Sequence, residues 1–310
     1  MTALPLVAGL VAIGAALAAT GQAPTAPAQE PAPVFRASAD VVSVEAAVRR
    51  ERRPVTGLTA ADFELLDNGV PQEITNISYE KLPIDVTVLL DVSASVTGSA
   101  LEELRRGLRQ LRTDLAAQDR LRLITFDMRI RRLVDFSDPA PAADKALASI
   151  GTAGSSSIFD SLAVALTTAV APGRRQLVVL FSDGQDSSSI SDAETLLDVA
   201  RRNTPTVAVV LASQSLQRPA SLLRNSSKLA GATIGGLADQ IASNTGGFVV
   251  AFAPGDNLSS PFRRVLEQFR ASYVLYFTPR GVERVGSHSL EVRVKSAKVE
   301  VRARSGYVWK

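Results

Sequence analysis

Carboxylate and hydroxyl side chains follow two apolar runs of the sequence, at points where buried strands are expected to end. Asp91 ends the run DVTVLLD and is followed by Ser93 and Ser95, whereas Asp183 follows QLVVLFS and precedes Gly184. A spacing of two in an extended segment turns alternate side chains to one side, so a carboxylate and two hydroxyls can converge. Open α/β sheets place their ligand sites at the carboxyl ends of their strands. We therefore expect these side chains to contribute to one site.

A third segment can add a hydroxyl group to this set. The Gly/Ser-rich stretch GTAGSSSIFDSL opens an expected helix, and Ser156 is the candidate donor, with Ser155 or Ser157 as the donor if the register differs by one. Asp186 lies in a serine-rich loop, where exposure to solvent is the simplest expectation. Alternatively, Asp186, Ser155 and Ser157 could contact the metal ligands without contacting the ion itself. All these donors are hard oxygens, which favours Mg²⁺, Mn²⁺ or Ca²⁺ over softer metals.

Two residue counts limit the catalytic chemistry available. Cysteine is absent and His288 is the only histidine, so a zinc site built on these residues lacks ligands. A serine-histidine-acid triad would need His288, which is far from the candidate site in sequence and is expected on the surface at a strand start. No G-x-S-x-G motif is present. We predict no enzyme, and a metal-assisted hydrolase that uses metal-bound water is the less favoured alternative.

The charge pattern does not favour nucleic acid as a partner. The 34 Lys and Arg residues nearly cancel 31 Asp and Glu residues, which leaves a formal charge of +3. The arginines occur mainly as pairs spread along the chain, whereas nucleic-acid-binding proteins usually gather them on one face.

The amino-terminal segment predicts export. Residues 1–23 are uncharged and apolar and end in small residues, as in a signal peptide or an uncleaved N-terminal anchor, which would be the chain's only contact with a membrane. Residues 24–34 are rich in Pro and Ala and predict a linker. We expect the remainder to be periplasmic, envelope-associated or secreted.

Hydrophobic periodicity divides the rest of the chain into three parts. Residues 35–82 alternate apolar and polar side chains around an Asn68-Gly69 turn, which predicts β strands and a hairpin. In residues 83–270 short apolar runs alternate with helical periods, which predicts a doubly wound, mostly parallel six-stranded sheet with helices on both faces. Residues 271–310 are strand-like again. The two β segments are each too short to bury a face alone, so we expect them to pair into one flanking domain.

The motifs resemble the von Willebrand factor A (VWA) family and its metal-ion-dependent adhesion site. The D-x-S-x-S motif matches Asp91, Ser93 and Ser95, the acidic position after the fourth strand matches Asp183, and the family's threonine position matches Ser156. The resemblance implies that these residues hold a divalent ion directly or through water and that a partner's carboxylate completes its coordination. Serine in place of threonine keeps the hydroxyl but loses the methyl that restricts rotation, which implies weaker metal binding.

The flanking segments extend this resemblance to a subfamily of secreted bacterial proteins described in acidobacteria. RPVTGLTAADFELLDNGVPQEI, SYVLYFTP and VRARSGYVW are similar to its β segments. The resulting hypothesis is an exported adhesion-type module that captures an Asp or Glu of a partner protein through Mg²⁺ (or Mn²⁺ or Ca²⁺). A structural envelope protein with a decayed metal site is the alternative. The sequence leaves the partner and the oligomeric state open.

Overall fold

The computed structural model describes residues 41–51, 53–80, 82–93, 99–152, 154–168, 171–212, 234–253, 256–295 and 298–309. These residues all belong to one compact unit, Ala39–Lys310. The expected signal segment, the linker and Ser95 lie outside the described residues. Among the helices that are described, none is both long and apolar enough to cross a bilayer.

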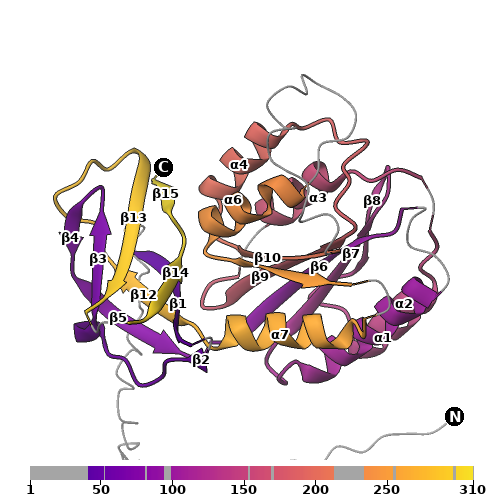
Figure 1. Cartoon of the computed structure of the whole chain (residues 1–310), viewed down its shortest axis with the longest axis horizontal. Helices are drawn as coiled ribbons and strands as arrows, with labels where there is room; N and C mark the ends of the chain where they lie inside the picture. Colours follow the sequence, from indigo (N-terminus) through magenta and orange to yellow (C-terminus); the bar gives the residue numbers. More distant parts are fainter. Residues whose placement is uncertain are drawn as a thin grey trace, which may run out of the picture. The chain divides into compact units, whose positions relative to one another are not determined.

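A six-stranded sheet forms the centre of the larger lobe, which we call the α/β lobe (Figure 1). Its order is β11-β10-β9-β6-β7-β8, and all neighbours are parallel except β8, which runs antiparallel to β7. Every residue of β6 is buried, as expected of a strand covered on both faces. The strands are β6 (Ile84–Asp91), β7 (Arg120–Phe126), β8 (Ile130–Val134), β9 (Arg175–Ser182), β10 (Thr206–Ala212) and β11 (Phe248–Phe252).

Helices cover both faces of this sheet and create two separate cores. One face packs against α1 (Ser99–Asp114), α2 (Ala140–Ala148) and α7 (Ser259–Arg270). The other packs against α3 (Ile158–Thr167), α4 (Ala193–Arg202) and α6 (Gly235–Thr245). The inward stripe of α1 consists of Leu104, Leu108 and Leu111, spaced by four and three residues, which is the period of an amphipathic helix.

Strands from both ends of the described chain interleave in a second, smaller lobe, which we call the β lobe (Figure 1). One sheet has the order β14-β1-β12-β5, with β2 paired to β1, and the other has the order β15-β13-β3-β4. Both sheets contribute to one core. The strands are β1 (Val42–Arg50), β2 (Arg53–Pro54), β3 (Phe63–Asp67), β4 (Val70–Gln72), β5 (Ile74–Tyr79), β12 (Tyr273–Phe277), β13 (Gly286–Val294), β14 (Glu300–Ala303) and β15 (Gly306–Trp309).

These two lobes confirm the predicted fold class, including the β-rich part built from both ends of the sequence. Asn68 and Gly69 connect β3 to β4 with φ values of 48° and 80°, the left-handed pair that a two-residue type I′ hairpin needs. The domain boundaries predicted at residues 83 and 270 stay a prediction.

His288 is not on the surface, and that prediction was wrong. The side chain is buried, with 3 % exposed, and its Nδ1 lies 2.8 Å from Oδ1 of Asp67. Tyr307 donates its hydroxyl to the other carboxylate oxygen of Asp67 at 2.7 Å. Because side chains alternate along β13, His288 points toward the β-lobe core, where Asp67 forms a hydrogen bond with its polar ring.

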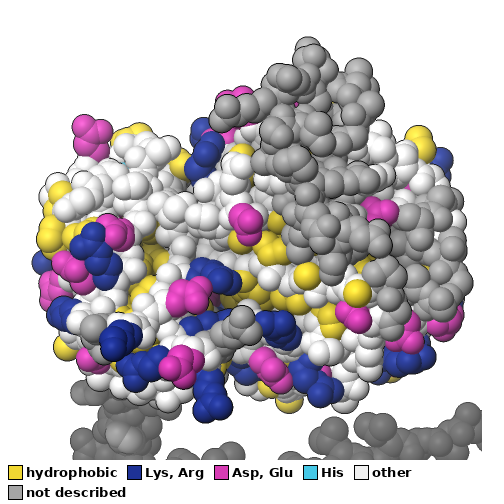
Figure 2. Space-filling view, in the orientation of Figure 1, with side chains coloured by type: hydrophobic (Ala, Val, Ile, Leu, Met, Phe, Trp, Pro, Cys, Tyr) yellow, Lys and Arg dark blue, Asp and Glu magenta, His cyan; other side chains and the backbone are white. Residues whose placement is uncertain are grey.

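Charged side chains of both signs share the molecular face drawn in Figure 2. Basic and acidic groups are interspersed along the edge formed by α1 and α7. One such pair joins the two helices, with Arg263 Nε 3.2 Å from Asp114 Oδ2. Pairs of this exposed kind contribute little to stability.

Candidate functional site

Asp91, the last residue of β6, lies at the centre of the candidate site. Its side chain is fully buried. Oδ1 accepts hydrogen bonds from the Ser93 backbone N–H at 3.0 Å and from Ser156 Oγ at 3.0 Å. Ser182 Oγ donates to Oδ2 at 2.6 Å. The carboxylate is therefore surrounded by hydroxyl and amide donors.

Sheet register explains why these segments meet. β6 and β9 are parallel neighbours with Leu90 opposite Phe181, so the next residues, Asp91 and Ser182, lie side by side where the strands end. The loop before α3 brings Ser156 to the same edge. The structure thus gathers three of the predicted residues, Asp91, Ser93 and Ser156, around one carboxylate.

Backbone contacts select Ser156 over its neighbours as the hydroxyl that faces Asp91. Its N–H donates to Ser187 Oγ at 3.0 Å, and its carbonyl accepts the N–H groups of Ser187 and Ser188 at 2.9 and 3.0 Å. Ser157 instead donates its hydroxyl to the Asp127 carbonyl at 2.7 Å. Ser155 is partly exposed beside them.

Asp186 fastens a third loop to the start of α3. Its Oδ1 accepts the N–H of Ile158 at 2.7 Å and the hydroxyl of Ser189 at 2.6 Å. Burial raises the pKa of this carboxyl, against the hydrogen bonds that favour its charged form. A carboxylate here satisfies helix N–H groups that have no partner within the helix. Asp186 is only 7 % exposed, so its interpretation as a solvated loop residue was wrong.

Asp183 is the more accessible carboxylate of the site. It is partly exposed, and its Oδ1 accepts the Gln185 N–H at 3.2 Å. Burial raises the pKa of Asp91, and the negative charge of Asp183 raises it further, while hydrogen bonds from Ser182 and Ser93 act in the opposite direction. Two carboxylates are therefore close enough to repel each other at the end of the sheet.

The donor set fits a hard divalent cation. Within the described ranges, no Lys or Arg forms an ion pair with Asp91, and no three His, Cys, Asp or Glu side chains gather in one place. A cation at this edge would thus be held by hydroxyls as well as by two carboxylates. Such oxygen ligands suit Mg²⁺, Mn²⁺ or Ca²⁺.

Sequence reasoning missed Ser182. Its hydroxyl donates to Asp91 and accepts the Gly184 N–H at 2.9 Å, so it fixes both the carboxylate and the turn that carries Asp183. The signal was present, because Ser182 is a polar residue at the end of a run that is otherwise apolar and central.

A doubly wound α/β domain with oxygen-bearing side chains at its strand ends is the class of protein that this geometry defines. Residues 85–235 match the model of the von Willebrand factor type A domain, so this part of the chain is similar to that family. A search of curated proteins gives no match.

Several solved structures are similar to this chain at low sequence identity. A von Willebrand factor type A protein from Catenulispora acidiphila is 11% identical over 89% of this chain and 76% of that one, with a TM-score of 0.49. The proximal thread matrix protein 1 of the mussel byssus, solved with a zinc-occupied MIDAS motif, is 16% identical over 64% and 48%, with a TM-score of 0.48. An aerotolerance-related membrane protein from Bacteroides fragilis is 16% identical over 60% and 98%, with a TM-score of 0.44.

Proposed function

We propose that this chain is an exported, metal-dependent protein-binding module. Asp91, Ser93, Ser95, Ser156 and Asp183 would hold Mg²⁺, or Mn²⁺ or Ca²⁺, at the carboxyl ends of β6 and β9. The ion would leave one position for an Asp or Glu of a partner protein. Ser95 enters this proposal from the sequence motif, since it lies outside the described residues.

The burial of Asp91 is the observation that carries the proposal. A fully buried carboxylate is costly unless a counter-charge compensates it. The described residues around Asp91 provide hydroxyl and amide donors, and the negative charge of Asp183 raises the pKa of Asp91 further. A divalent cation would offset both negative charges, and this site would then bind an acidic side chain through the ion.

Each residue of the site has a distinct role in this account. The hydroxyls of Ser93 and Ser156 would be direct ligands, while Asp91 and Asp183 would supply negative charge directly or through water. Ser182 positions Asp91, and Asp186 positions the loop that carries Ser156. When bound, the ion supplies electrostatic attraction for an incoming carboxylate.

The position of His288 weighs against a hydrolase at this site. The ring lies in the β lobe and pairs with Asp67, so it cannot act as a base for Ser93 or Ser156. A hydrolase that relied on metal-bound water would still need a proton acceptor. The Asp91 carboxylate already accepts hydrogen bonds from hydroxyls, and both carboxylates would interact with the proposed ion.

The sequence supports the exported location and the domain organisation that we propose. Residues 1–23 would direct export or anchor the chain, and residues 24–34 would separate that segment from the folded part. Residues 83–270 would form the VWA domain. Residues 35–82 and 271–310 would form the β lobe beside it.

An affinity capture from the native envelope tests this function. The full chain is immobilised and exposed to envelope extract with Mg²⁺, with EDTA, and with Mg²⁺ restored after EDTA. We expect a bound protein that EDTA releases and Mg²⁺ restores. Asp183→Ala should abolish capture, whereas Asp198→Ala, which alters a carboxylate on the surface of α4 that is 43% exposed, should retain it. If EDTA does not reduce the amount of captured protein, the result would count against the proposal.

A further inference from the structure

Two large apolar side chains that are exposed lie in loops at the end of the sheet that holds the candidate metal site. Met128 is 67 % exposed in the turn between β7 and β8, and Ile190 is 98 % exposed in the loop between β9 and α4. The other exposed side chains of this kind among the described residues lie in α3 or outside the α/β lobe: Val41, Val164 and Val285. Single exposed apolar residues are ordinary, but two beside a binding site can form a contact surface.

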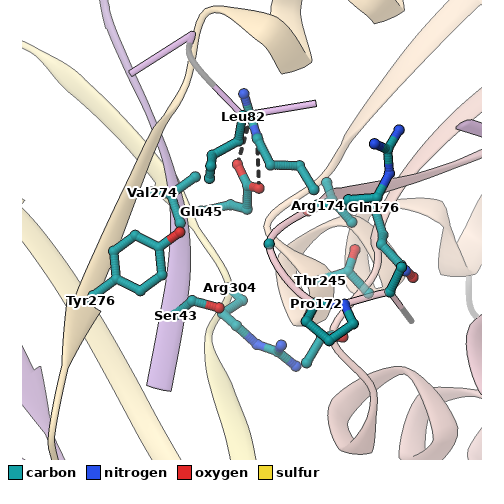
Figure 3. Close-up of a pocket in the computed structure, with 15 residues that line it drawn as sticks. Ser43, Glu45, Leu82, Pro172, Arg174, Gln176, Thr245, Val274, Tyr276 and Arg304 are labelled. Carbon is teal, nitrogen blue, oxygen red and sulfur yellow. Dashed lines mark hydrogen bonds and ion pairs between the residues drawn. The ribbon is translucent and has the colours of Figure 1, made fainter. Parts of the chain in front are cut away.

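The pocket of about 260 Å³ at the other end of the sheet offers no comparable apolar contact (Figure 3). Arg175, the first residue of β9, lines this pocket, and its Nη2 lies 2.7 Å from Oε2 of Glu45 in β1. Arg174 Nε lies 2.6 Å from Asp85 Oδ1. None of the large apolar side chains that are exposed in the described part of the chain lines this pocket. An apolar docking surface is therefore expected at the carboxyl ends of the strands instead.

The turn that carries Met128 is fixed beside the candidate metal site. It follows Phe126, the last residue of β7, which lies opposite Asp91 in the parallel register of β6 and β7. A Cβ atom added to Gly154 would lie 3.6 Å from Cγ and from Sδ of Met128. The Met128 side chain therefore packs beside the loop that carries Ser156, the hydroxyl that faces Asp91.

Hydrogen bonds hold the loop of Ile190 against the same Ser156 loop. The N–H groups of Ser187 and Ser188 donate to the Ser156 carbonyl at 2.9 and 3.0 Å. The N–H of Ile190 donates to Oδ2 of Asp160, in the first turn of α3, at 2.8 Å. The backbone of Ile190 is thus held in place while its side chain is almost fully exposed. A side chain presented in this way loses little conformational freedom when a partner covers it.

The turn between β7 and β8 also carries net positive charge. Arg129 and Arg131 are both exposed, and Arg131 Nη1 lies 2.9 Å from Asp127 Oδ2. One carboxylate and two guanidinium groups leave one positive charge on this turn. The loop of Ile190, in contrast, borders the carboxylate of Asp160. An acidic segment is therefore attracted to the turn, and a basic segment is repelled from it.

We propose that Met128 and Ile190 extend the metal site into a docking surface for a protein segment in which an acidic residue stands next to a large apolar residue. This inference rests on the function proposed above, because the ion would bind the acidic side chain. Met128 and Ile190 would contact apolar side chains on either side of that residue. The flexible, polarizable thioether of methionine suits such a contact, and methionine is enriched at protein interfaces. Arg129 would favour further acidic residues in the same segment.

Selection from a library of random short peptides displayed on phage tests this surface. The full chain is immobilised with Mg²⁺, and bound phage are eluted with EDTA, so that only peptides held through the ion are sequenced. We expect enrichment of Asp or Glu beside a large apolar residue, and depletion of Lys and Arg. Enrichment of acidic residues without an apolar neighbour would overturn this inference and leave the metal-dependent function intact. If EDTA releases no enriched peptide, both the inference and the proposed function are contradicted.

Substitutions of the exposed residues locate the apolar contact. Met128→Ser and Ile190→Ser should each weaken binding of the most enriched peptide about tenfold, as expected for the loss of one apolar contact. Both variants should bind Mg²⁺ with wild-type affinity, because neither side chain is a proposed ligand. Val285→Ser is the matched control, since Val285 is 72 % exposed outside the α/β lobe and should not affect peptide binding. Wild-type peptide affinity in both variants would overturn the inference, and so would a loss of peptide binding that weaker Mg²⁺ binding explains.

Discussion

Replacing Asp85 with asparagine should destabilise the protein strongly without changing its metal site. Asp85 is in β6, and its side chain is 1% exposed. Arg120 Nε donates to Oδ1 at 2.8 Å, and Arg174 Nε donates to the same oxygen at 2.6 Å. The carboxylate thus compensates two arginines at the end of the strand that lies opposite Asp91.

The expected magnitude is about 3 kcal/mol of unfolding free energy at pH 7. Removing one partner of a buried ion pair costs about 3–5 kcal/mol. The lower limit applies because Arg120 and Arg174 are 36% and 17% exposed, so water can solvate them once Asp85 is neutral. Asparagine also keeps one acceptor oxygen.

The pH dependence gives this prediction a second readout. Burial acts to raise the pKa of Asp85, but hydrogen bonds and charges from Arg120 and Arg174 outweigh it and hold the pKa below its usual value of 3.8. A depressed folded-state pKa contributes stability above the unfolded pKa, and that stability is lost as the pH falls through the folded one. The difference between wild type and Asp85→Asn should therefore be full at pH 7 and 5 and shrink below about pH 4.

Urea unfolding followed by circular dichroism at pH 7, 5, 4 and 3.5 measures this difference. Asp198→Asn is the matched control, since Asp198 pairs with Arg202 on the surface of α4 and should cost at most about 0.5 kcal/mol. A loss at pH 7 no larger than that of the control, or a difference that stays constant down to pH 3.5, would refute the reasoning.

Three further substitutions test other parts of the account. Asp186→Ala should cost about 2 kcal/mol in urea unfolding and weaken Mg²⁺ binding, because the start of α3 loses its acceptor; unchanged stability would contradict this. Tyr307→Phe should cost about 2 kcal/mol, because the buried Asp67 loses a hydrogen bond, and a melting temperature equal to that of the wild type would exclude that role. Gly247→Ala should prevent folding, as circular dichroism will show, because a Cβ atom there would lie 1.8 Å from the Val207 carbonyl oxygen; a folded variant would disprove the close approach.

Local patterns predicted those parts of the fold that local chemistry determines. The apolar runs of β6 and β9 predicted central strands, because strands covered on both faces need apolar residues throughout. Asn68-Gly69 predicted the β3–β4 hairpin, because few other residue pairs adopt two consecutive left-handed conformations. Asp91 and Asp183 were predicted to lie close together because parallel strands end at the same edge of a sheet.

Contacts between distant segments could not be predicted in the same way. Nothing near His288 in sequence indicates that Asp67, 221 residues earlier, compensates it. The sequence around Arg304 does not indicate that its side chain donates hydrogen bonds to two carbonyls at the end of α4, because that contact depends on how the lobes pack. Ser182 differs from these residues, because a polar residue at the end of the apolar run of β9 was a local signal and only its register beside Asp91 depends on strand order.

Calorimetric titration with Mg²⁺ tests the central claim most directly. The wild-type chain should bind one ion, and Ser156→Ala should bind it at least about tenfold more weakly because a hydroxyl ligand is lost. Ser157→Ala is the matched control, because that hydroxyl donates to the Asp127 carbonyl rather than to Asp91 and its loss should leave metal affinity nearly unchanged. The absence of binding at millimolar Mg²⁺ or Mn²⁺, or equal affinity in the wild type and Ser156→Ala, would contradict a metal site at these strand ends.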